Sequence, residues 1–171
     1  MPTARLPSPL SSSRPLASLP ACALLAACAL LTACSPSLIP GTRIPDKADN
    51  RAVLEVLGRY KQSAEALDMQ GVLGLASTSY FDRTSARGAA PVDYAGLQKT
   101  LSEKFSRLKA LKMEITVKDI RVEGDRAEVD YFLVMHFSLD LPSKEKWYPE
   151  SDDQRMALAR INGEWKVTAG L

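Results

Sequence analysis

The sequence predicts one α+β domain, in which amphipathic helices precede an antiparallel sheet. Apolar residues recur every three or four positions before Lys109 and every second position after it. The dipeptide Asn162-Gly163 separates two strand-like runs, and it is the strongest short signal for a tight hairpin. Because the helices are grouped together and the strands are grouped together, an alternating βαβ architecture is not expected.

Three helices are expected before the sheet. The first spans about residues 50–67 and carries one apolar face, formed by Val53, Leu57, Tyr60, Ala64 and Leu67. The second is short and begins after Asp68, whose carboxylate can accept hydrogen bonds from free backbone N–H groups. The third begins after Asp93 in the same way, and its apolar face comprises Tyr94, Leu97, Leu101, Phe105 and Leu108.

Four strands are expected after the helices. The first contains a polar step at Lys118-Asp119 that shifts its alternation and predicts a bulge. The second follows the turn at residues 123–126, and its second half is apolar on both faces, which predicts a central strand covered on both sides. The third is expected around residues 155–161, and the last covers residues 164–170. Their short connections predict a four-stranded antiparallel sheet.

This order of elements resembles the nuclear transport factor 2-like superfamily, which includes ketosteroid isomerases and polyketide cyclases of the SnoaL type. The resemblance covers about residues 50–171 and rests on Tyr60 with Asp68, on Tyr80-Phe81, and on the closing run of residues 160–167. It implies a cystatin-like roll, in which three helices pack on a curved sheet to form a cone with a pocket at its open end. It also implies that two copies can pair through their sheet faces.

The first 33 residues are a different kind of chain. They contain no acidic residue, two basic residues, and an unbroken apolar run from Ala21 to Leu31. Such a run is the hydrophobic part of a secretory signal peptide, and its 11 residues are fewer than the roughly 20 that a spanning helix needs. We therefore expect residues 1–33 to be removed on export.

The end of this segment, Leu31-Thr32-Ala33-Cys34, resembles the lipobox of bacterial lipoproteins. The resemblance implies cleavage between Ala33 and Cys34, a diacylglycerol thioether on Cys34, and a further acyl chain such as palmitate on the new amino terminus. The alternative is an ordinary secretory signal cut near Ala33, with Cys34 incidental. Ser35 replaces the Asp that retains lipoproteins in the inner membrane, which favours the periplasmic face of the outer membrane.

Removal of the signal peptide changes the composition. The mature chain has 138 residues, and because two of the 22 basic residues leave, 20 basic and 20 acidic residues remain. A formal charge of zero gives no reason to expect nucleic-acid binding. Cys22 and Cys28 also leave, so disulfides and thiolate metal sites are not expected, and one histidine makes a conventional zinc site improbable. No metal and no cofactor is expected, and residues 34–49, with three prolines, are expected to be a flexible tether.

The candidate catalytic residues are His136, Asp68 and Asp130. His136 could act as a general base near neutral pH, although a histidine satisfied by one hydrogen bond is the simpler interpretation. Asp68 is also explained as a helix cap. Asp130 and His136 share a strand face but lie about 20 Å apart along it, too far for an acid–base pair. The candidate ligand-binding residues are Tyr60, Tyr80, Tyr131 and Trp147, each of which can also be core packing.

Two classes of function follow. The favoured one is a membrane-anchored envelope lipoprotein without enzymatic activity, which binds a small apolar ligand in the cone or a protein, such as a second copy, on the sheet. The rival is a small isomerase, dehydratase or cyclase that uses His136 or an aspartate in the pocket. The position of His136 distinguishes them, because a general base must lie in a cavity beside a second ionisable group.

Overall fold

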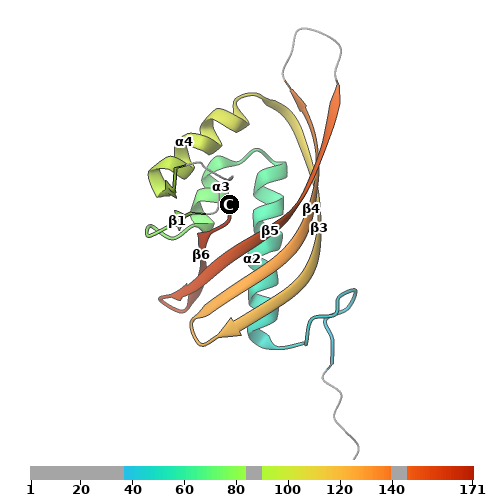
Figure 1. Ribbon diagram of the computed structural model, residues 1–171, viewed down its shortest axis with the longest axis vertical. Helices are drawn as coiled ribbons and strands as arrows, with labels where there is room; N and C mark the ends of the chain where they lie inside the picture. Colours follow the sequence, from blue (N-terminus) through green and yellow to red (C-terminus); the bar gives the residue numbers. More distant parts are fainter. Residues whose placement is uncertain (1–36, 84–89, 140–145) are drawn as a thin grey trace, which may run out of the picture. The chain divides into compact units, whose positions relative to one another are not determined.

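The computed structural model describes residues 37–83, 90–139 and 146–171 (Figure 1). Three helices precede the main sheet: α2 (Ala48–Glu65), α3 (Met69–Leu75) and α4 (Tyr94–Phe105). The main strands are β3 (Leu108–Glu123), β4 (Arg126–Leu139), β5 (Trp147–Ile161) and β6 (Glu164–Ala169), and two short strands, β1 (Phe81–Asp82) and β2 (Val92–Asp93), lie between α3 and α4. The predicted α+β class is confirmed. The predicted cleavage and lipidation residues, Ala33 and Cys34, lie outside the described residues.

Both predicted helix caps are confirmed. The backbone N–H of Gly71 donates to Asp68 Oδ1 at 2.9 Å, and that of Gly96 donates to Asp93 Oδ1 at 2.8 Å. The third helix is shorter than predicted, because it ends at Phe105 and Leu108 already pairs with Leu139 in the sheet. None of the described helices is long and apolar enough to cross a membrane.

The main sheet is antiparallel throughout, with the order β3-β4-β5-β6. The predicted bulge is confirmed, since the register between β3 and β4 shifts between Val117 and Asp119. The predicted hairpin is also confirmed: Asn162 and Gly163 have φ angles of +53° and +84°, and a type I′ turn requires positive φ at both positions.

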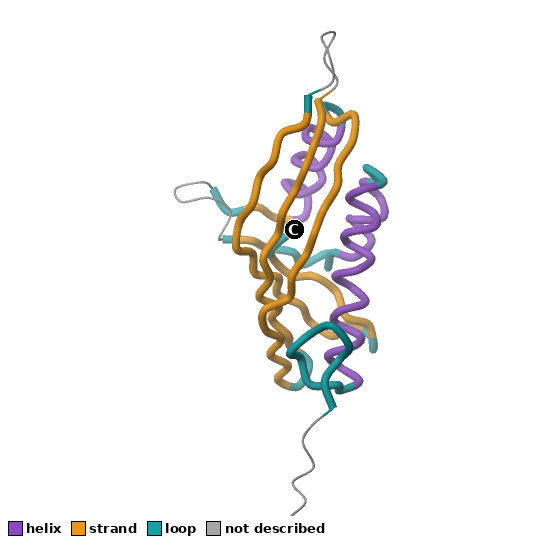
Figure 2. Tube along the Cα trace, turned by 90° about the vertical axis from the view of Figure 1, so that its right-hand side faces the viewer, coloured by secondary structure: helices purple, strands orange, loops and turns teal. Residues whose placement is uncertain are grey.

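Two predictions about the strands were wrong. The third strand begins at Trp147 rather than near Arg155, because pairing with β4 recruits a polar segment that has no apolar alternation. The central strand β4 is covered on one face only: Val129 and Tyr131 are buried, whereas Phe132 is 36% exposed. The physical reason is that α2, α3 and α4 all lie on the concave side of the sheet (Figures 1 and 2).

The core lies between that concave face and the helices. Its least exposed side chains come from both layers: Val53 and Val56 of α2, Val72 of α3, and Val129, Met156 and Val167 of the sheet. Ile44, which precedes α2, is also buried in this core at 3% exposure. The segment expected to be a flexible tether is therefore folded against the domain from Ser37 onward, because Ile44 gains the burial of an apolar side chain.

Candidate functional site

Three of the four predicted ligand-binding residues meet inside the domain. Tyr60 comes from α2, Tyr80 follows α3, and Tyr131 comes from the concave face of β4. Tyr80 and Tyr131 are each 2% exposed, and Tyr60 is partly buried. Burial, with a smaller contribution from Tyr80, raises the pKa of Tyr60 to about 12, and burial also raises the pKa of Tyr131. The three phenols are thus neutral hydrogen-bond donors near pH 7 rather than bases.

A buried carboxylate that sequence reasoning did not single out lies beside this cluster. Asp82 is 5% exposed, and its Oδ2 accepts from the backbone N–H of Gly170 at 3.2 Å and from the Tyr80 hydroxyl at 3.5 Å. The Tyr80 hydroxyl accepts in turn from the backbone N–H of Leu171 at 3.1 Å. Because these groups bind the end of β6 and the residues after it, Tyr80 and Asp82 fix the chain there.

The two other tyrosines have different surroundings. Among the described residues, none accepts a hydrogen bond from the hydroxyl of Tyr60 or Tyr131. Among the described residues, the fully buried side-chain polar atoms without a hydrogen-bond partner are Ser138 Oγ and Trp165 Nε1, and neither tyrosine hydroxyl is one of them.

His136 does not face this interior. It lies on β4, where it pairs in register with Lys112 and Pro149. Side chains alternate along a strand, so His136 lies on the outer face with Phe132, and Tyr131 lies on the inner face. The structure thus places the candidate general base on the side of the sheet opposite the tyrosines.

The two candidate aspartates are engaged elsewhere. Asp130 also lies on the outer face, where Arg155 Nε and Arg121 Nη2 donate to its two oxygens at 2.6 and 2.9 Å. The hydrogen bond from Arg155, with a smaller contribution from Arg121, holds the pKa of Asp130 below its usual range. Asp68 caps α3. Neither carboxylate is brought near the tyrosine cluster.

Trp147, the fourth predicted ligand-binding residue, is separated from the tyrosines. It begins β5, pairs with Ser138, and is 44% exposed. Because directly paired residues share a face, Trp147 lies on the outer face of the sheet near its far end.

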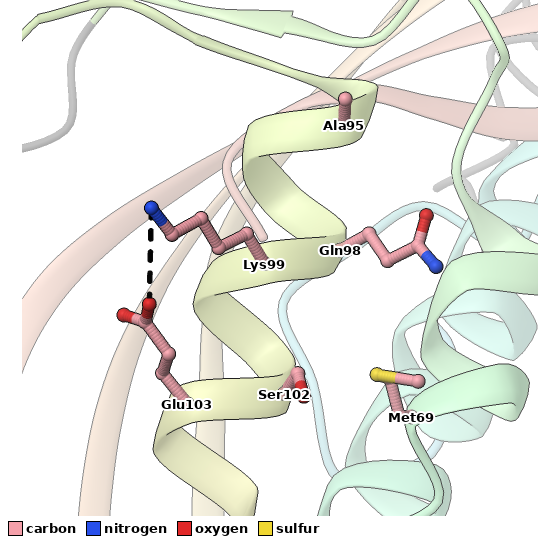
Figure 3. Close-up of a pocket in the computed structure, with 6 residues that line it drawn as sticks. All are labelled: Met69, Ala95, Gln98, Lys99, Ser102 and Glu103. Atoms are coloured by element: carbon pink, nitrogen blue, oxygen red, sulfur yellow. Dashed lines mark ion pairs between the residues drawn. The ribbon is translucent and has the colours of Figure 1, made fainter.

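Two surface hollows stand out in the described part of the chain, and neither includes a tyrosine. One, of about 420 Å³, lies between α3 and α4 and is lined by Met69, Ala95, Gln98, Lys99, Ser102 and Glu103 (Figure 3). Lys99 and Glu103 are 4.0 Å apart and largely exposed. The other, of about 290 Å³, lies at the turn between β3 and β4. Within the described residues, no cluster of three or more His, Cys, Asp and Glu could hold a metal ion.

The outer face of the sheet is the most distinctive surface of the described residues. Its centre is Phe132, and Lys118 Nζ lies 5.5 Å from the centre of that ring. Val134 and His136 continue the strip toward Trp147. Charged residues of both signs border the strip in a network of ion pairs: Asp119, Arg121, Glu128, Asp130, Arg155, and Lys118 with Asp153.

No family model and no curated protein matches the chain. Solved structures do match. A conserved protein from Planctomyces limnophilus superposes with a TM-score of 0.65 at 15% identity, over 72% of this chain and 93% of that chain. A ketosteroid isomerase-like protein from Erwinia carotovora atroseptica gives a TM-score of 0.60 at 12% identity, over 72% and 94% of the two chains.

A third structure carries the family name in its description. It is a candidate dehydratase of the nuclear transport factor 2-like family from Streptomyces avermitilis, with a TM-score of 0.61 at 13% identity, over 71% of this chain and 93% of that chain. Identities this low establish the fold alone. The domain has the nuclear transport factor 2-like fold, as the order of its predicted elements indicated.

Proposed function

We propose that this chain is a lipid-anchored lipoprotein of the cell envelope that acts by binding a protein, in the first instance a second copy of itself, through the outer face of the sheet. The observation that supports this proposal is the strip around Phe132, an aromatic centre bordered by charges of both signs. Protein interfaces have this composition, with aromatic residues at the core and a polar rim. When two identical faces pair about a two-fold axis, positive groups of one copy can meet negative groups of the other, provided that both signs are interspersed on the face.

The same geometry disfavours catalysis by the predicted residues. A general acid or base must reach a substrate in a pocket, and it is useful when its pKa lies near the working pH. His136 and Asp130 lie outside the cone, Asp68 caps a helix, and the interior tyrosines have pKa values raised far above neutrality. A binding function needs none of these groups to exchange a proton.

One observation favours a second candidate, the binding of a small ligand inside the cone. The hydroxyls of Tyr60 and Tyr131 have no acceptor among the described residues, and a ligand carbonyl or hydroxyl could accept from them. Two of the structural neighbours are a ketosteroid isomerase-like protein and a candidate dehydratase. A small ligand bound inside the cone would suit functions of that class. Native mass spectrometry of the purified protein tests this alternative by detecting a bound small molecule that the Tyr131→Phe variant lacks.

Disulfide trapping tests the protein-binding face. If Cys34 is lipidated, the mature chain has no free thiol, so an introduced cysteine is a unique reporter. Phe132→Cys at the centre of the strip should form a disulfide-linked dimer in the oxidising envelope, because two-fold pairing brings the two copies of this position together. The matched control is Gln98→Cys, which is exposed on α4, away from the sheet.

The expected result is a dimer band on a non-reducing gel for Phe132→Cys and its absence for Gln98→Cys. Phe132→Glu should shift the native mass of the otherwise unaltered protein from dimer to monomer, because it places a carboxylate at the apolar centre of both copies. Equal trapping at the two positions, together with a monomeric mass for the unaltered protein, would contradict the proposed pairing.

A further inference from the structure

The segment before α2 forms a folded loop, which we call the collar and define as residues 37–47. Its two arms are held by backbone hydrogen bonds from Ile39 to Ile44 at 2.9 Å and from Asp46 to Ser37 at 2.6 Å. The hydroxyl of Thr42 closes the tip by donating to the Ile39 carbonyl at 2.9 Å. The collar therefore has a defined shape of its own.

Three contacts fix the collar to α2 and the core. Ile44 is buried at 3% exposure, the Asn50 side-chain amide donates to the Pro45 carbonyl at 2.8 Å, and Arg51 forms a two-pronged ion pair with Asp46. Asn50 is itself 5% exposed, so this hydrogen bond is protected from water. These contacts make the collar one rigid piece with the first turn of α2.

The collar lies at one end of the domain. Arg160 marks the same end, because it pairs with Asp49 in the first turn of α2 and its backbone N–H donates to the Asp125 carbonyl in the turn between β3 and β4. Figure 1 shows the collar beside the start of α2, with the end of β4 and the start of β5 at the opposite end. The 15 residues of β5 separate the two ends by up to about 46 Å at roughly 3.3 Å per residue.

The distance from the expected lipid attachment to the collar is short. Ser37 is three residues after Cys34, and three residues span at most about 11 Å. That reach is about a quarter of the length of β5, so the attachment holds the collar end, and not the far end, close to the lipid. A tether of that length places the collar at the membrane surface.

We propose that the collar seats the domain on a phospholipid surface, with the start of α2 toward the bilayer and the Trp147 end away from it. This inference rests on the proposed lipidation of Cys34. The outer face of the sheet then stands upright on the membrane, where a second copy in the same leaflet can reach it. The collar is thus a second, protein-based contact with the membrane beside the acyl chains.

The exposed side chains of the collar suit a phospholipid surface. Leu38 is 50% exposed, although it is large and apolar, and it can enter the boundary between headgroups and acyl chains. Arg43 and Lys47 are exposed, whereas the nearby carboxylates of Asp46 and Asp49 are engaged by Arg51 and Arg160. Cations close to a bilayer are attracted by lipid phosphates.

Depth-dependent quenching tests this orientation. The lipidated protein, purified from membranes, would be reconstituted into vesicles of phosphatidylethanolamine and phosphatidylglycerol that carry a quencher at the headgroup. Single cysteines labelled with a fluorophore would report from the collar, in Pro40→Cys, and from the far end of β5, in Ser151→Cys, both of which are exposed positions. We expect the Pro40 label to lose most of its fluorescence and the Ser151 label to lose none.

A collar variant that combines Leu38→Ser, Arg43→Gln and Lys47→Gln, all at exposed positions, provides the matched control. It should leave the protein bound to vesicles in flotation and reduce the quenching of the Pro40 label, because the collar has lost the side chains that contact the phospholipid surface. Equal quenching of the two labels in vesicle-bound protein, or unchanged quenching in the collar variant, would overturn the seating alone. Failure of the unaltered protein to float with vesicles would overturn the lipid anchoring, and the seating with it.

Discussion

Among the described glycines, Gly170 is the one at which a side chain is least tolerated. Its φ is +89°, and an added Cβ would lie 2.1 Å from the Arg155 carbonyl oxygen and 2.9 Å from Met156 Cα. The neighbours are backbone atoms of a paired strand, so they cannot move aside cheaply. The glycine allows β6 to end against β5 while its N–H reaches Asp82.

Gly170→Ala should therefore lower the free energy of unfolding by about 2 to 4 kcal/mol, from the strained φ and the overpacking together. Chemical denaturation monitored by circular dichroism measures the change. The same substitution at Gly58, an exposed position inside α2 with open space around it, should instead stabilise the protein by about 0.5 to 1 kcal/mol. A loss at Gly58 as large as that at Gly170 would contradict this explanation.

Glu65 links the end of α2 to the edge strand of the sheet. Its carboxylate accepts from Lys61 Nζ at 2.7 Å and from the backbone N–H of Met113 at 2.8 Å. The hydrogen bond from Lys61, followed by that from Met113, lowers the pKa of Glu65 from its usual value. A lowered pKa means that the charged form stabilises the fold, and that this stabilisation is lost as the pH falls through the folded-state pKa.

Glu65→Gln should cost about 0.5 to 1 kcal/mol near pH 7, because the amide can still accept from Met113 but no longer pairs with Lys61. The difference between the two proteins should shrink as the pH falls below 4.5, the ordinary value for this side chain, and disappear once both states are protonated. Urea denaturation at several pH values measures it. A difference that stays constant down to acidic pH would rule out the charge as its cause.

How well the sequence predicted the role of a single residue depended on how far along the chain its hydrogen-bond partner lies. The caps Asp68 and Asp93 bind backbone N–H groups three residues along the chain, and local sequence shows such arrangements. Asp82 binds Gly170, 88 residues away, so nothing near Asp82 distinguishes it from an aspartate in a turn. His136 could be assigned to a strand, but the sequence could not show which face of that strand meets the helices.

At the scale of elements, the hairpin that joins β5 and β6 depends on the left-handed backbone of its turn. Gly163→Val should destabilise the domain by about 1 to 2 kcal/mol, because a residue with a Cβ pays that cost at positive φ. Thermal unfolding measures the effect. The control is Glu164→Val, which places the same side chain at the first position of β6, where a β-branched residue is favoured. Equal stability of the two variants would count against the type I′ turn.

The elements themselves were predictable where packing follows local periodicity. The three helices and the bulge in β3 follow from apolar spacing, because one face of each element is buried. The first half of β5 was not predictable, since residues such as Pro149 and Asp153 are held in the sheet by pairing with β4 rather than by burial of their own side chains. The burial of Ile44 was not predicted, because a single core residue in a proline-rich segment produces no apolar periodicity.

At the scale of the whole molecule, the predicted cone and its helices agree with the structure, and the two surface hollows that stand out among the described residues lie away from the tyrosines. Tyr80 and Tyr131 lie where a ligand was expected, each 2% exposed. Two of the exposed aromatic residues, Phe132 and Trp147, lie on the opposite face, and a third, Phe81, belongs to the short strand β1. The exposed residues of this face are available for the protein contact proposed above.

Under the proposed lipid anchoring, the location of the molecule depends on Cys34. Cys34→Ala should release the protein from membranes, because it removes the acceptor of the diacylglycerol group, and two or more acyl chains are needed for lasting attachment. The fold should be unchanged, since Cys34 precedes all the described residues that pack in the core. Membrane fractionation with an intact-mass measurement of the mature protein tests both points.

Ser35→Asp is the matched control, which should keep the lipid and shift the protein to the inner membrane. Retention of Cys34→Ala in the membrane with an uncut signal peptide would show that the segment anchors the chain without lipid, and would contradict the lipobox assignment.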